Sequence, residues 1–207
     1  SGLEKAIDWQ VEEAQSLGIR VVLCRGSMDR SQKDGGLPPD SVVQTSDEIL
    51  EDSERLINKY HNSNEGAMTQ IALAPCSPFS VSEKVMHESS KLSKKHSVLL
   101  HTHLAETDDE NSFCLEKMGC CPLEYLEQVG WLTNRTWLAH GIHFTDKEIQ
   151  KLGTSKTGLA HCPSSNMLLS SGVCRVPELE KSGVPVGIGV DGSASNDTSN
   201  IMQEVRQ

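Results

Sequence analysis

Apolar residues recur along the chain at two different spacings, and these spacings predict the secondary structure. Leu3, Ile7, Val11 and Ala14 recur at the spacing of one helix face, and Gly18 follows as a typical helix terminator. The next apolar segment is a short continuous run, which favours a buried strand. The chain therefore begins with a predicted helix that leads into a strand.

Five further apolar runs of similar length follow, each separated from the next by a loop and a helical pattern. The six predicted strands cover residues 19–24, 70–74, 98–103, 136–140, 158–161 and 184–190. Capping boxes at Thr45–Glu48 and Ser80–Glu83 predict the starts of two of the intervening helices. The helix that starts at the first box is expected to run to about Tyr60.

Strands that alternate with helices predict an α/β fold with parallel pairing. A TIM-type (β/α)₈ barrel uses about 31 residues per unit, and the spacing here fits that rhythm. A doubly wound sheet is the rival fold, but no GxGxxG motif follows the first strand. The sequence therefore predicts about six of the eight units of a barrel.

The ends of the chain extend this prediction. The chain starts on a helix and ends within a helical pattern at residues 200–207, without a stop signal. We therefore expect residues 1–207 to form a single partial barrel domain that lacks the first two strands and the last helix. A complete protein of six units is the alternative.

Composition excludes several classes of partner. The formal net charge of −10 disfavours a protein that binds nucleic-acid backbones. No apolar run approaches the roughly 20 residues that span a bilayer, which predicts no membrane partner. The seven cysteines contain no CxxC, and no charged-then-apolar leader opens the sequence. These features predict reduced thiols and a cytoplasmic location.

Polar residues with catalytic or ligating potential collect where the predicted strands end. In the segment HTHLAE, His101 and His103 point to the same side of a strand, and Glu106 follows on a loop. Imidazoles beside a carboxylate suit proton transfer next to a metal-activated water. Five of the eight histidines fall at strand ends, namely His101, His103, His140, His143 and His161.

Four segments carry a resemblance to a known family. In chain order they are HTHLAE (101–106), LAHGIH (138–143), HCPSSN (161–166) and GVDGSASND (189–197). Together they resemble the amidohydrolase superfamily, and within it the metal-dependent deaminases and aminohydrolases of purines and triazines. This resemblance implies one divalent metal ion, with zinc expected first and iron or manganese as alternatives.

The resemblance also implies roles for individual residues. His103 and Asp191 correspond to metal ligands, and His140 corresponds to the histidine at the metal that holds the attacking water or the substrate. Asp191 would take a proton from that water, and Glu106 matches the proton shuttle. The family's His-x-His pair on the first strand is absent, because the pair His101 and His103 lies in a later unit of the barrel. The site is therefore expected to hold metal weakly, or not at all, on two or three protein ligands.

Five further residues are candidates for contact with substrate, and most have an alternative role. Arg25 contacts the substrate or only anchors its loop, and Cys76 and Phe79 recognise a ring or only begin a helix. His143 and Asn166 follow two of the site strands, and His143 is expected to support neighbouring site residues rather than to act in catalysis. His101 is expected to pack or hydrogen-bond beneath the site. His161 supports the site or contacts the substrate.

The expected function is hydrolytic deamination of a small aminated nitrogen heterocycle, a hydrolase reaction on a C–N bond. The resemblance places 8-oxoguanine and guanine first, and a hydroxylated triazine is the alternative substrate. The alternative that is not an enzyme is a barrel fragment without catalytic competence. Because relatives commonly pair subunits, a homodimer is a further expectation of the resemblance.

Overall fold

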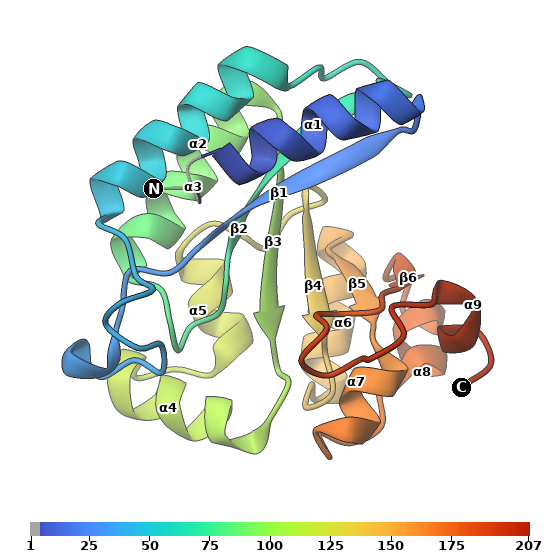
Figure 1. The fold of residues 1–207 in the computed structure, drawn as a ribbon. Helices are drawn as coiled ribbons and strands as arrows, with labels where there is room; N and C mark the ends of the chain where they lie inside the picture. The colour runs from blue at the N-terminus through green and yellow to red at the C-terminus, as the bar shows by residue number, and fades with distance from the viewer. Residues whose placement is uncertain (1–4) are drawn as a thin grey trace. The chain divides into compact units, whose positions relative to one another are not determined.

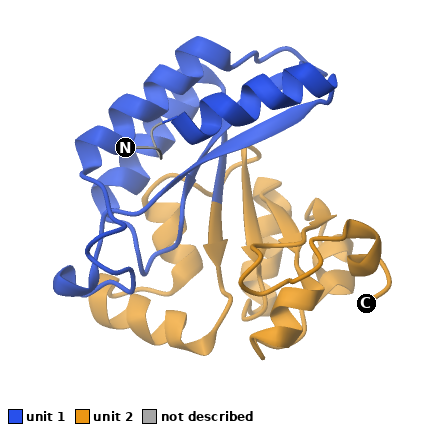
Figure 2. Cartoon of the chain, viewed as in Figure 1, with its two compact units in different colours: residues 1–101 blue, residues 102–207 orange. Residues whose placement is uncertain are grey.

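The computed structural model describes residues 5–207 and divides into two compact units (Figure 2). Unit 1 comprises residues 1–101 and unit 2 comprises residues 102–207. The boundary falls within one strand, β3 (Leu99–Leu104). Leu3, which the sequence places in the first helix, lies outside the described residues. The single partial barrel domain remains a prediction.

Along the chain, unit 1 begins with a helix, continues with two βα repeats and ends at the start of β3 (Figure 1). Its elements are α1 (Ala6–Leu17), β1 (Val21–Ser27), the 3₁₀ turn η2 (Gln32–Asp34), α2 (Ser46–Tyr60), β2 (Thr69–Pro75) and α3 (Glu83–His96). Strands β1 and β2 pair in parallel from Val21–Thr69 to Ser27–Pro75. Strand β2 pairs in parallel with β3 at Ala72–Leu99.

Unit 2 continues the same alternation. Its elements are the end of β3, α4 (Asp108–Met118), α5 (Pro122–Gln128), β4 (Thr136–His140), α6 (Asp146–Ser155), β5 (Gly158–His161), α7 (Pro163–Leu168), α8 (Val176–Lys181), β6 (Val186–Ile188) and α9 (Ile201–Glu204). Strands β4, β5 and β6 are parallel neighbours in chain order. The predicted α/β fold with parallel strands is confirmed, and β4 and β5 have the predicted boundaries.

Each unit buries its own apolar side chains between helices and strands. The largest fully buried side chains are Ile49, Leu56, Ile71, Leu73, Met86 and Leu100 in unit 1 and Leu104, Leu123, Leu126, Trp131, Leu138 and Leu152 in unit 2. Burial of a large apolar side chain contributes roughly 1.5 to 3 kcal/mol. This packing fixes the strands whose ends carry the candidate site. Among the described residues, no helix is long and apolar enough to span a membrane.

One of the two predicted capping boxes forms, and the other does not. Thr45 and Glu48 make both reciprocal hydrogen bonds at the start of α2. The box predicted at Ser80–Glu83 is wrong, because Ser82 is the residue that caps α3. Asp29 binds both the backbone N–H and the hydroxyl of Ser82, and this holds the chain at the helix entry. The contact joins residues far apart in sequence, so a local pattern does not reveal it.

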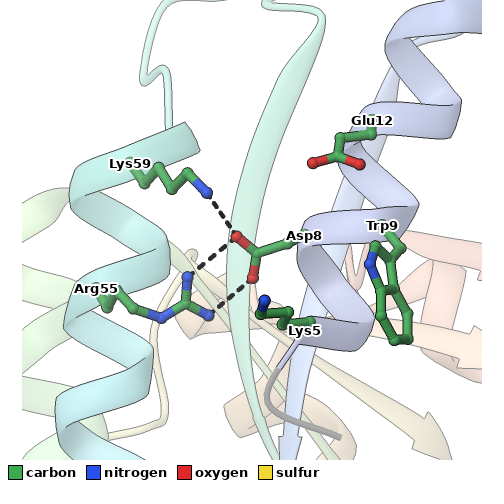
Figure 3. A pocket seen from close by; sticks show the side chains of 6 residues that line it. All are labelled: Lys5, Asp8, Trp9, Glu12, Arg55 and Lys59. Carbon is green, nitrogen blue, oxygen red and sulfur yellow. Dashed lines mark hydrogen bonds and ion pairs between the residues drawn. The ribbon is translucent and has the colours of Figure 1, made fainter. Parts of the chain in front are cut away.

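A buried carboxylate ties two helices of unit 1 together (Figure 3). Asp8 on α1 is buried and accepts two hydrogen bonds from Arg55 on α2, at 2.8 and 3.1 Å. Lys59 and Tyr60 donate to the same carboxylate at 2.8 and 2.6 Å. The hydrogen bonds from Arg55, with those from Lys59 and Tyr60, hold the pKa of Asp8 well below its usual range despite burial.

Asp8→Asn is expected to destabilise the protein at neutral pH, by about 1 to 3 kcal/mol, because it removes a charged acceptor from several donors. Because the pKa of Asp8 is lowered in the folded state, its ionised carboxylate stabilises the folded protein at pH values above the unfolded-state pKa of about 3.9. This stabilisation is lost as the pH falls below that value. The difference between wild type and variant should therefore shrink below about pH 4. Denaturant unfolding at several pH values measures it.

Asp47→Asn is the matched control, because Asp47 forms an exposed ion pair with Lys84 on α3 at 2.8 Å. Exposed pairs contribute about 0 to 1 kcal/mol, so this variant should remain close to wild type. Equal losses in the two variants would contradict a special role for the Asp8 network.

Candidate metal centre

Three side chains with ligand atoms converge in unit 2. They are His103 on β3, His140 at the end of β4 and Asp191 in the segment after β6, and one ligand atom of each lies within 4.8 Å of the others. The two imidazole rings are stacked, with centroids 5.4 Å apart and planes 25° apart. The structure thus brings together the three residues that the resemblance placed at a metal.

Strand alternation explains how His103 reaches this group. On β3, Leu100, Thr102 and Leu104 are buried, whereas the alternate positions are only half-buried. Successive side chains of a strand point to opposite faces, so His103 leaves the face that packs into the core. The alternation of side chains along the sequence HTHL predicts this orientation of His103.

The backbone turns sharply next to all three ligands. Ala105, His140 and Asp191 have φ values of 53°, 73° and 62°, in the left-handed region. This region costs a non-glycine residue roughly 1 to 2 kcal/mol, and such residues concentrate at functional sites. Gly141 continues the turn after His140, and a Cβ atom there would collide with Leu159. The turns direct side chains in a way that strand spacing alone does not specify.

Asn166 on α7 fixes the orientation of the His140 ring. The His140 Nδ1 atom and the Asn166 Oδ1 atom are 2.9 Å apart, and both side chains are buried. Because an amide oxygen only accepts hydrogen bonds, Nδ1 carries the proton and donates. The other nitrogen, Nε2, lies 3.6 Å from the Glu106 carboxylate and 3.8 Å from that of Asp191. Asn166 therefore supports His140 directly.

Two serines and a backbone amide hold the Asp191 carboxylate. Ser165 donates to Oδ2 at 2.6 Å, Ser195 donates to Oδ2 at 3.2 Å, and the Gly192 N–H donates to Oδ1 at 2.7 Å. Burial acts to raise the pKa of Asp191, but the hydrogen bonds from Ser165 and Gly192, together with the nearby imidazoles of His140 and His103, lower it overall. Sequence reasoning did not single out Ser195, although its place in GSASND after Asp191 is a usable signal.

Glu106 lies on the loop between β3 and α4, outside the group of three ligands. Its side chain is a quarter exposed, and its carboxylate faces His140. The buried Glu110 accepts a hydrogen bond from the Glu106 N–H at 3.2 Å. Sequence reasoning also missed Glu110, whose spacing of four residues from Glu106 is the only local signal.

His143 and His161 have different surroundings within unit 2. His143 donates from Nε2 to the Ser171 carbonyl at 3.0 Å, and its Nδ1 lies 3.0 Å from Asp108. Both ring nitrogens are thus engaged, which favours support of the neighbouring loops over contact with substrate. His161 has a buried Nδ1 without a hydrogen-bond partner among the described residues, and burial lowers its pKa.

The remaining candidates for substrate contact belong to unit 1. Arg25 on β1 is buried and pairs with Asp52 at 2.6 Å and with Gln44 at 3.0 Å. This arrangement favours the anchoring role that the sequence left open for Arg25. Cys76 and Phe79 both line an apolar cavity of about 280 Å³ that follows β2. Their role in recognising a ring remains a prediction.

The donor set at the centre fits a divalent metal. Two imidazole nitrogens and a carboxylate oxygen are ligands that zinc accepts, with bonds of about 2.0 to 2.2 Å. In a tetrahedral site such bonds put two ligand atoms roughly 3.4 Å apart, and the atoms of this group lie within 4.8 Å of one another. The hydrogen bonds of Asn166 to His140 and of Ser165 to Asp191 are the kind that orient metal ligands.

Comparisons with known proteins agree with this geometry. The chain is 58% identical over 206 residues to the 8-oxoguanine deaminase of Pseudomonas aeruginosa, covering 100% of the chain and 46% of that protein. It is 36% identical to the hydroxydechloroatrazine ethylaminohydrolase of Pseudomonas sp. strain ADP, covering 97% of the chain and 41% of that protein.

A solved structure of the atrazine chlorohydrolase of Arthrobacter aurescens, complexed with zinc, superposes with a TM-score of 0.93 at 30% identity. The match covers 98% of this chain and 44% of that one. The chain thus spans less than half the length of these relatives and has the fold of the corresponding part. The Amidohydrolase family matches residues 2–207, the range that contains all four motifs and the converging ligands. The chain belongs to the amidohydrolase family.

Proposed function

We propose that the full-length protein catalyses the hydrolytic deamination of an aminated nitrogen heterocycle, with 8-oxoguanine as the preferred substrate. The observation that carries the proposal is the meeting of His103, His140 and Asp191 beside the separate carboxylate of Glu106. Ligands and a proton-transfer group are thus distinct side chains within one unit. The 58% identity to an 8-oxoguanine deaminase supports the choice of substrate.

His103 and Asp191 would hold the metal ion, with the Nε2 atom of His140 directed at the same place. When bound, a divalent metal supplies a Lewis acid that makes water nucleophilic near neutral pH. Asp191 is suited to ligation because Ser165 and Gly192 favour its ionised form.

Glu106 would carry the proton in this reaction. As water attacks the amino-bearing ring carbon, a C–O bond forms and the water gives up two protons. Glu106 would carry one of them to the ring nitrogen, and Asp191 would take the other, which Glu106 then passes to the leaving amine. The C–N bond breaks, and ammonia departs. His140 orients the attacking oxygen, because Asn166 fixes its ring with Nε2 toward the site.

Amine removal from a hydroxylated triazine is the second candidate function. The hydroxydechloroatrazine ethylaminohydrolase at 36% identity and the triazine hydrolase structures favour it. Purine and triazine substrates both present an aminated carbon between ring nitrogens, so the same residues serve either reaction. Substrate choice within a shared fold depends on the residues around the site.

Ammonia release by the full-length protein on 8-oxoguanine, guanine and hydroxylated triazines tests the proposal. We expect 8-oxoguanine to give the highest kcat/KM. A clear preference for a triazine would move the assignment to the second function. Metal-loaded protein that releases no ammonia from any of these compounds would overturn the proposed chemistry.

Asn166→Ala is expected to lower kcat by about 10- to 100-fold, the usual cost of removing a group that orients a metal-site histidine. Asn134→Ala is the matched control, because Asn134 is exposed and precedes β4 rather than following it. Steady-state kinetics and metal content on both variants measure the effect. Parental kcat and metal content in Asn166→Ala would show that the contact with His140 is dispensable.

A further inference from the structure

The turn that presents Glu106 is held from one side by the segment after β4. The N–H groups of Ile142 and His143 both donate to the Ala105 carbonyl, at 2.8 and 3.1 Å. The Gly141 N–H donates to the Leu104 carbonyl at 3.1 Å. Ala105 itself has a φ of 53°, a conformation that a non-glycine residue keeps only where its surroundings enforce it.

Glu110 holds the same turn from the other side. It lies in the first turn of α4 and is 2% exposed, and its Oε2 accepts the Glu106 N–H at 3.2 Å. The backbone N–H of Ala105 also interacts with this carboxyl group. The second oxygen, Oε1, is buried without a hydrogen-bond partner among the described residues.

This arrangement is unusual for a residue that serves stability alone. A buried carboxyl oxygen without a partner is costly to desolvate, and an apolar residue would fill the same space at less cost. Burial, with a smaller contribution from the charge of Glu106, raises the pKa of Glu110 to about 7, against the opposing effect of the two N–H groups. Both the neutral and the ionised carboxyl keep an oxygen that accepts from those N–H groups.

We propose that Glu110 is a positioning residue, which holds the Ala105–Glu106 turn so that the Glu106 carboxylate faces His140. This inference rests on the proposed function, because it assigns to Glu106 the transfer of the proton. Glu110 accepts from the backbone N–H groups of Ala105 and Glu106 and would act through Glu106. Misplacement of a reacting group by about 1 Å can cost on the order of 10²-fold in rate, so a loosened turn should lower kcat.

Glu110→Met and Glu110→Gln in the full-length protein separate positioning from stability. Methionine fills a similar volume without an acceptor, whereas glutamine keeps one oxygen for the Glu106 N–H. We expect Glu110→Met to lower kcat by roughly 10- to 100-fold, with metal content and KM little changed. Glu110→Gln should retain most of the kcat. Glu116→Met on the same helix is the control, because Glu116 is exposed and should leave kcat unchanged.

The decisive measurement is a double-mutant cycle with Glu106→Gln. A residue that acts only through Glu106 should cost little further kcat when Glu106 is already disabled. The same fold-loss from Glu110→Met in both backgrounds, or a parental kcat in Glu110→Met, would overturn the inference. Should Glu110→Met not fold, Glu110→Ala takes its place in the cycle. Wild-type protein without deaminase activity would instead overturn the proposed function itself.

Discussion

His103→Ala and Asp191→Ala are each expected to remove both the bound metal and the proposed deaminase activity of the full-length protein. Each variant deletes one of three ligand atoms that lie within 4.8 Å of one another. An incomplete set of ligands binds the ion more weakly and leaves the water insufficiently acidic for attack. Metal analysis of purified protein, together with ammonia release, measures both losses.

His87→Ala is the matched control for these two variants. His87 lies on α3, and its side chain is about half exposed, so its loss should change neither metal content nor turnover. Full metal occupancy together with normal turnover in either ligand variant would contradict the assignment of the centre.

Glu106→Gln is expected to retain metal and substrate affinity and to lose turnover by at least about 10²-fold, as for a lost acid–base group. The carboxylate lies 3.6 Å from His140 but is not one of the three converging ligands, so its charge is not needed to hold the ion. Metal content, melting temperature and kcat on one preparation measure the effect.

The competing interpretation is that Glu106 only supports the start of α4. Loss of a helix cap costs on the order of 1 kcal/mol and would appear as a lowered melting temperature rather than as lost turnover. In the structure, Thr107 occupies the capping position. A metal-loaded Glu106→Gln protein that turns over at the parental rate would rule out the proton-shuttle role.

The fold was predictable where local patterns and packing agree. Strands β4 and β5 have the predicted ends because their apolar runs coincide with the segments that pair. Strand β6 is shorter than the predicted 184–190 and covers only Val186–Ile188. Apolar character marks burial, whereas the length of a strand depends on where its neighbour pairs with it.

The candidate site was predictable in its ligands but not in their supports. His103, His140 and Asp191 each follow or end a strand, and the carboxyl ends of parallel strands meet at one edge of a sheet. Glu110 and Ser195 were not predicted, because their roles depend on contacts that form only after folding. Glu110 accepts a backbone N–H, and Ser195 donates to a carboxylate. Arg25 lies on β1, two residues before the strand ends at Ser27, and its guanidinium pairs with Asp52 on α2. Strand position alone did not reveal that partner.

A crystal structure of the zinc-loaded full-length protein, with anomalous data at the zinc absorption edge, would show directly which side chains hold the metal ion. We expect an anomalous peak within about 2.0 to 2.2 Å of ligand atoms of His103 and Asp191, with His140 beside it. A zinc ion bound by other residues, with these three side chains making no contact with it, would contradict the assignment of the metal centre.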